Sequence, residues 1–125
     1  MKKIILSGGG TGGHIYPAVA VAEALKRRLG DEVELLFVGA EGKMEMEKVP
    51  ALGYRIVGLP IAGLQRRMDW HNLAVPFKVL KSVSMAKKTI REFGADAVVG
   101  FGGYASAPVL WAAQRLGVPT VIQEQ

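Results

Sequence analysis

The sequence predicts an α/β fold in which a parallel sheet carries helices on both faces. Short, almost wholly apolar runs alternate with amphipathic helical patterns, and glycines stand at most of the junctions between them. Parallel strands joined through helices require right-handed crossovers, so the alternation implies one Rossmann-like domain over residues 1–125. We find no repeat, linker or low-complexity tract in the sequence.

Glycines mark the first strand and the first helix. Residues 4–7 form an apolar strand that runs into Gly8, and a helical pattern begins near Pro17. Gly30 ends this helix, because glycine readily adopts the left-handed conformation that closes many helices. The apolar face of the helix consists of Ala18, Val21, Ala22, Leu25 and Leu29.

A second strand, a short helix and a third strand follow. Residues 32–38 are almost continuously apolar, as expected for a strand covered on both faces, and Gly39 is expected to close it. A short helix is predicted over residues 41–52, with Pro50 disturbing its end, and the third strand over residues 54–59.

One long helix dominates the middle of the chain. Residues 61–70 are expected to form an irregular loop, and a helical pattern over residues 71–93 ends at Gly94, with Pro76 near a kink or its true start. The predicted buried stripe of this helix comprises Val79, Leu80, Val83, Ala86, Ile90 and Phe93.

The last predicted elements are a strand over residues 97–99, a helix over residues 108–116 that Gly117 caps, and a strand over residues 119–123. A doubly wound domain ordinarily continues from such a strand into a helix or a partner domain. We therefore expect that the chain, which stops at Gln125, has been cut from a longer protein.

Composition narrows the classes of function. The chain has no cysteine, which excludes disulfides, thiolate zinc sites and cysteine nucleophiles. Its net charge is +5, and the segment from Arg66 to Glu92 holds seven basic and two acidic residues, so this segment accounts for the whole excess. The charge favours an anionic partner without choosing among nucleic acid, a phosphate ligand and a lipid surface. No run approaches the roughly 18 apolar residues of a spanning helix, so any membrane contact should be peripheral.

A glycine-rich turn follows the first strand. Gly8, Gly10 and Gly13 match G-x-G-x-x-G between a strand and a helix, where glycines allow close approach to a pyrophosphate and the helix start attracts its charge. This context favours a phosphorylated ligand, and a tight turn without a ligand is the alternative. A Walker nucleotidase is excluded, because His14 and Ile15 stand where Lys and Ser or Thr are required.

A dinucleotide-binding oxidoreductase domain remains an alternative. Such a domain needs an acid at the end of the second strand, about 20 residues past the glycines, to hold the ribose. Gly39 stands there, and the nearest acid, Glu41, lies 28 residues past Gly13. The dinucleotide interpretation is weakened but stays open, and so does a non-catalytic module that binds a membrane or a partner.

His14 is a candidate base at the mouth of the first helix. A neutral imidazole there can accept a proton from a hydroxyl, and a protonated one can contact phosphate, whereas the alternative is a helix-capping role. His71 lies in a polar helix start with no constellation around it. Two histidines without cysteine make a dedicated metal site unexpected.

Two further segments are expected at the same edge as the glycine turn. Residues 100–106 follow the fourth strand and residues 123–125 end the fifth, and the carboxyl ends of parallel strands share one edge. Tyr104 and Ser106 offer hydroxyls, and the Glu124 carboxylate can orient a histidine or a sugar hydroxyl. The three segments therefore predict one ligand site.

These segments, 9–14, 102–104 and 124–125 in this order and spacing, resemble the MurG family of bacterial peptidoglycan N-acetylglucosaminyltransferases. The resemblance covers the whole chain, including Met44-Glu45, Ser106 and Pro108. It implies the amino-terminal domain of a glycosyltransferase-B fold, in which two Rossmann-like domains enclose the active site. This first domain would bind the acceptor, and the carboxyl-terminal donor-binding domain would be absent from the chain.

The implied activity is inverting transfer of N-acetylglucosamine from UDP-N-acetylglucosamine to the muramoyl 4-hydroxyl of lipid I, which gives lipid II in cell wall synthesis. No metal ion or other cofactor is implied, and no nucleic acid. Carried over by position, the implied catalytic residues are His14 and Glu124. The implied substrate-binding residues are Thr11, Gly12, Gly13, Gly102, Gly103, Tyr104, Ser106 and Gln125.

Two departures from the family pattern stand at the end of the chain. Gln123 occupies the position where the family often has a histidine, which puts a catalytic task there in doubt. The asparagine expected directly after Gln125 is absent because the chain ends. On this resemblance the isolated chain should be nearly inactive.

The resemblance also gives the basic segment a partner, since the family is peripheral at the cytoplasmic face of the bacterial membrane. Leu73 and Phe77 lie at i, i+4 off the predicted buried stripe, near Trp70 and flanked by Lys78 and Lys81, an arrangement suited to an anionic leaflet. A solvated lysine face is the alternative. The candidate membrane contacts are Trp70, Leu73, Phe77, Lys78 and Lys81.

Overall fold

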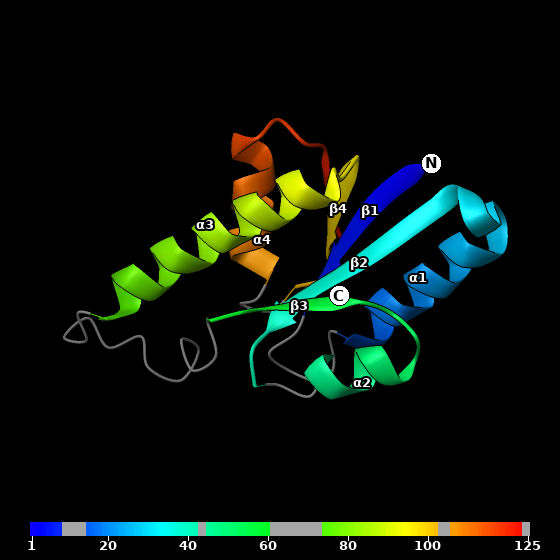
Figure 1. Cartoon of the computed structure of the whole chain (residues 1–125), viewed down its shortest axis with the longest axis horizontal. Coiled ribbons are helices and arrows are strands. Elements are labelled where there is room, and N and C mark those ends of the chain that lie inside the picture. The colour runs from blue at the N-terminus through cyan, green and yellow to red at the C-terminus, as the bar shows by residue number, and fades with distance from the viewer. Residues whose placement is uncertain (9–14, 43–44, 61–73, 103–105, 124–125) are drawn as a thin grey trace.

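The protein is a five-stranded parallel sheet between two layers of helices (Figure 1). The computed structural model describes residues 1–8, 15–42, 45–60, 74–102 and 106–123, without the side chains of residues 74–78. The strands are β1 (Lys2–Ser7), β2 (Val33–Ala40), β3 (Ile56–Leu59), β4 (Ala97–Gly100) and β5 (Thr120–Ile122). Their order is β3-β2-β1-β4-β5 and every neighbouring pair is parallel, which confirms the α/β, Rossmann-like prediction.

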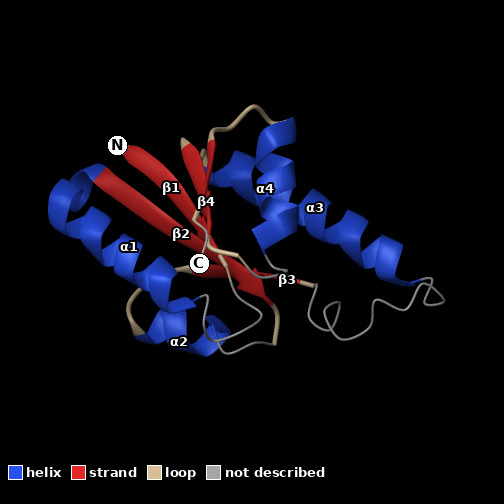
Figure 2. Ribbon diagram, turned by 180° about the vertical axis from the view of Figure 1, so that it is seen from behind, coloured by secondary structure: helices blue, strands red, loops and turns tan. Residues whose placement is uncertain are grey.

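The helices cover both faces of this sheet. They are α1 (Ile15–Leu29), the short 3-10 turn η2 (Gly30–Glu32), α2 (Glu45–Ala51), α3 (Ala74–Phe93) and α4 (Ser106–Arg115). Helices α1 and α2 lie on one side, and α3 and α4 on the other, as the view from behind makes plain (Figure 2).

Alternate residues of the strands β1 to β4 pack into two separate cores. Ile5 points into the core under α3 and α4, and its neighbour Leu6 into the core under α1. In β2 the same alternation leaves both faces covered, which explains its continuous apolar run. Phe101, directly after β4, is 1% exposed and belongs to the core under α1.

Two predicted boundaries at the carboxyl end of β2 are wrong. The strand does not close at Gly39 but runs on to Ala40, paired with β3. The following helix begins at Glu45 and not at Glu41, because the Glu41 N–H donates to the Leu59 carbonyl at 2.9 Å and so extends the ladder. A turn at Gly42, whose φ of 74° suits glycine, then separates strand from helix.

The buried stripe of α3 is shorter than predicted. Val83, Ala86, Ile90 and Phe93 are buried as expected, whereas Val79 is 37% and Leu80 61% exposed. The amino-terminal half of α3 extends away from the sheet (Figure 1), so the helical periodicity continues where the sheet no longer covers it.

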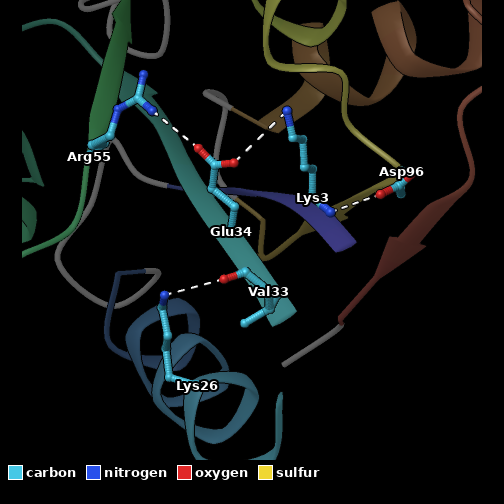
Figure 3. A network of polar contacts seen from close by, with 6 residues as sticks. All are labelled: Lys3, Lys26, Val33, Glu34, Arg55 and Asp96. Carbon is cyan, nitrogen blue, oxygen red and sulfur yellow. Dashed lines mark hydrogen bonds and ion pairs between the residues drawn. The ribbon is translucent and has the colours of Figure 1, made fainter. Parts of the chain in front are cut away.

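Two ion pairs of Glu34 lie at the amino-terminal edge of the sheet. Glu34 joins Lys3 of β1 at 3.9 Å and Arg55, directly before β3, at 3.6 Å, and the Lys3 backbone N–H donates to Asp96 at 2.8 Å (Figure 3). A hollow of about 230 Å³ opens beside them under the end of α3. Both features lie at the opposite end of the strands from the glycine turns, so they belong to the scaffold.

Candidate functional site

The order of the strands reverses between β1 and β4. From β1 the chain moves outward to β2 and β3, and then crosses to β4 and β5 on the other side. In open parallel sheets, ligands bind outside the carboxyl ends of the strands at this switch point. Ser7 ends β1 and pairs with Gly100, the end of β4, so the turns that follow both strands start side by side at the switch point.

Backbone hydrogen bonds carry the sheet one residue beyond these strands. The Phe101 N–H donates to the Ser7 carbonyl at 2.8 Å, and the Gln123 N–H donates to the Gly100 carbonyl at 2.9 Å. On the other side, the Gly8 N–H lies 3.4 Å from the Val38 carbonyl. The first described residues of the three predicted segments are therefore neighbours along one edge.

Most of the predicted site residues lie outside the described residues. These are Thr11, Gly12, Gly13, His14, Gly103, Tyr104, Glu124 and Gln125. Two candidate membrane residues, Trp70 and Leu73, are likewise outside, and only the helical backbone is described at Phe77 and Lys78. The roles assigned to all of them stay predictions.

Two predicted substrate-binding residues are described. Gly102 has a φ of 96°, a left-handed conformation that favours glycine, so it shapes the turn after β4 whether or not a ligand binds. Ser106 begins α4 and is 5% exposed, which leaves little of it open to a ligand. Its contact with substrate stays a prediction.

Gly100 has a packing role that sequence reasoning did not assign. A Cβ atom there would lie 2.7 Å from Leu110 Cδ1, so glycine lets α4 pack directly against the end of β4. The last residue of β4 and the glycine that follows the strand thus have different roles: Gly100 leaves room for α4 to pack, and Gly102 permits a turn.

The carboxyl end of β2 bears on the dinucleotide alternative. Because the strand runs to Ala40, the exposed Glu41 follows it directly, nearer to the position of a ribose-binding acid than the sequence indicated. A second carboxylate, Glu45, is completely buried here, and its Oε2 accepts the Ala40 N–H at 3.1 Å. Sequence reasoning missed this role for Glu45, and the signal for it was a glycine at the next-to-last position of a strand followed by an acid at a helix start.

Helix α3 presents basic and apolar side chains to solvent at its described end. Lys81 is exposed beside Leu80, and Lys88 and Arg91 are exposed further along. Within the described part of the chain, no helix is long and apolar enough to cross a membrane. The described residues also contain no group of three or more acidic or histidine side chains placed to hold a metal ion.

Comparison with known proteins gives one consistent result. The family described as glycosyltransferase family 28 N-terminal domain matches residues 4–125. A relative from Parabacteroides distasonis is 57% identical over 98% of this chain and 33% of its own length. Its name is UDP-N-acetylglucosamine--N-acetylmuramyl-(pentapeptide) pyrophosphoryl-undecaprenol N-acetylglucosamine transferase. A relative of the same name from Cytophaga hutchinsonii is 59% identical over 98% of this chain and 33% of its own length.

Solved structures agree with the family match. The crystal structure of Acinetobacter baumannii MurG superposes with a TM-score of 0.83 at 33% identity, over 98% of this chain and 35% of that one. The Streptomyces glycosyltransferase SsfS6 superposes with a TM-score of 0.72 at 17% identity, over 98% of this chain and 39% of that one, a likeness of fold alone. The chain spans about a third of the length of the curated relatives it matches.

Proposed function

The chain belongs to the family of glycosyltransferase family 28 N-terminal domains, and we propose that it forms the acceptor-binding half of an N-acetylglucosaminyltransferase of peptidoglycan synthesis. The observation that carries the proposal is the 57% identity, over 98% of the chain, with a transferase named for this reaction. The switch point supports it, because two glycine-bearing turns start there side by side.

In the proposed reaction, the 4-hydroxyl oxygen of the muramoyl sugar in lipid I attacks the anomeric carbon of N-acetylglucosamine from the face opposite UDP. The bond to UDP breaks and UDP leaves with the electron pair, so the configuration inverts. The hydroxyl proton passes to a base, for which His14 is our candidate, with Glu124 orienting it or the sugar. The acceptor diphosphate would lie near the start of α1, whose first N–H groups favour a bound anion.

A second domain would hold the donor nucleotide and close the other wall of the site. The test is a hybrid enzyme in which this chain replaces the matching segment of the Parabacteroides relative, assayed with labelled UDP-N-acetylglucosamine and a soluble lipid I analogue. The hybrid should form the disaccharide product and the chain alone should not. A folded but inactive hybrid would contradict the proposed function, and robust turnover by the chain alone would contradict the half-enzyme proposal.

The two histidines allow a matched pair of variants that tests whether His14 is the base. In the hybrid, His14→Ala should lower kcat by about 10²–10⁴-fold, the usual worth of a positioned acid or base. His71→Ala should leave kcat within about twofold, because nothing assigns it a role. Equal kcat in both variants would remove His14 from the mechanism.

We further propose that the chain binds the cytoplasmic face of the bacterial membrane through the start of α3. The contacts would be Trp70, Leu73, Phe77, Lys78 and Lys81, together with the exposed Leu80. Each basic residue near an anionic leaflet contributes about 1 kcal/mol. Lys81→Glu removes this attraction and adds a repulsion of similar size, about 2 kcal/mol in all, so it should weaken binding about 30-fold. Sedimentation with vesicles containing anionic lipid measures this effect, and Lys48→Glu, an exposed site on α2, is the control. Equal losses from both variants would refute a localised contact.

A further inference from the structure

Glu45 is a charged residue in a place where proteins rarely put one. It is 0% exposed at the start of α2, directly under the carboxyl edge of the sheet. Burying a carboxylate is costly unless hydrogen bonds compensate for the lost water, and its Oε2 accepts the Ala40 N–H at 3.1 Å. A side chain without access to solvent contacts substrate poorly, so any role in the site must act through the backbone that it holds.

The Ala40 N–H has a particular position in the ladder. Amide groups of successive strand residues point to opposite sides, and Glu41 bonds to β3 through the Leu59 carbonyl. Ala40 therefore faces the other neighbour, β1, on the same side as Val38, whose carbonyl lies 3.4 Å from the Gly8 N–H. Since β1 ends at Ser7, opposite Val38, the Glu45 carboxylate accepts the next β1-facing amide of β2 beyond the end of β1.

Gly39 shows on which face the carboxylate lies. A Cβ atom on Gly39 would be 2.7 Å from Glu45 Cγ and 3.1 Å from its Oε2, so the side chain lies across this glycine. Residue 39 shares its face of β2 with Phe37, which packs in the core under α1. Helix α1, which begins at Ile15, covers that same face, so Glu45 lies on the α1 side of the sheet.

We propose that Glu45 is a positioning residue of the acceptor site: its buried carboxylate holds the end of β2 and thereby fixes the edge from which the Gly8 turn starts. The inference rests on the proposed function for what the turn binds. In this role Glu45 transfers no proton and does not touch the substrate. Only the position of its Oε2, which accepts the Ala40 N–H, is required, so an amide oxygen at the same place should serve nearly as well.

The first test compares three variants of the hybrid enzyme at a temperature where circular dichroism shows all of them folded. Glu45→Ala should lower kcat/KM for the lipid I analogue at least tenfold, and Glu45→Gln should stay within about threefold, because its amide oxygen still accepts the Ala40 N–H. Glu47→Ala, an exposed carboxylate on the same helix, should stay within about twofold. Wild-type kcat/KM in Glu45→Ala, or an equal loss in Glu47→Ala, would overturn the inference.

The second test uses Gly39. Gly39→Ala should displace the Glu45 side chain and lower kcat/KM as much as Glu45→Ala does. The double variant should be no worse than Glu45→Ala alone, because no side chain is left to displace. Multiplied losses in the double variant would show that the two residues act separately. If Glu45→Ala does not fold, Gly39→Ala and Glu45→Gln carry the test by themselves.

Amide hydrogen exchange in the 125-residue chain separates this inference from the proposed function. Protection of the Ala40 amide should persist in Glu45→Gln and fall at least tenfold in Gly39→Ala. A folded, inactive wild-type hybrid would count against the proposed function. Unchanged Ala40 protection in Gly39→Ala would count against the inference that Glu45 holds the end of β2.

Discussion

Replacing Phe101 with alanine tests whether the turn after β4 is anchored by its own side chain. Phe101 is 1% exposed in the core under α1, and its N–H donates to the Ser7 carbonyl at 2.8 Å. Alanine keeps that backbone bond, so the variant reports on the ring alone. Truncating a buried phenylalanine costs about 3–5 kcal/mol through lost transfer free energy and the cavity left behind.

The magnitude translates directly into a urea midpoint. A domain of this size loses about 2 kcal/mol of unfolding free energy per molar urea, so a cost of about 4 kcal/mol lowers the midpoint by about 2 M. Far-ultraviolet circular dichroism of the chain in urea measures it, and the slope should not change. Leu52→Ala, 54% exposed, is the control and should shift the free energy by less than about 0.5 kcal/mol. A midpoint shift below about 0.5 M in Phe101→Ala would refute the anchoring role.

Three further predictions concern stability. Ser82→Ala should raise the free energy of unfolding by about 1 kcal/mol, because the Ser82 hydroxyl is buried without a described hydrogen-bond partner, and a lower melting temperature would contradict this. Burial, and to a smaller extent the charge of Glu23, raise the pKa of Tyr54 above its ordinary value of 10.0. The stability that the neutral Tyr54 contributes is therefore complete below that pH and falls as pH rises through the folded pKa. Tyr54→Phe should flatten this fall in melting curves recorded at alkaline pH. Gly100→Ala should cost about 1–3 kcal/mol by overpacking against Leu110, and adding Leu110→Ala should give less than the sum of the two single costs in urea titrations.

Local patterns were sufficient for the order and type of the elements. Apolar runs and glycines act over a few residues, so the five strands, the α1 and α4 helices and the stop of α3 at Gly94 were all predicted near their observed places. The edge that carries the candidate site followed from the parallel topology, because parallel strands place all their carboxyl ends together.

The errors arose where a distant segment decided the outcome. Gly39 looked like a strand end, but the Glu45 side chain occupies the space over it while β3 pairs with it. Leu80 followed the buried period of α3, yet the periodicity of a helix says nothing about how far the sheet beneath it extends.

By itself, the sequence determined that the chain is an α/β domain with glycine turns at one edge and a basic segment along one helix. Those properties depend on side-chain periodicity and on the backbone freedom of glycine, which neighbouring residues set. Only the tertiary structure decided that Gly100 leaves room for α4 to pack, that Leu80 stays exposed, and that the buried carboxylate of Glu45 accepts a hydrogen bond from the end of β2. Each of these depends on which elements pack against one another in the folded chain, and no local pattern of residues encodes those neighbours.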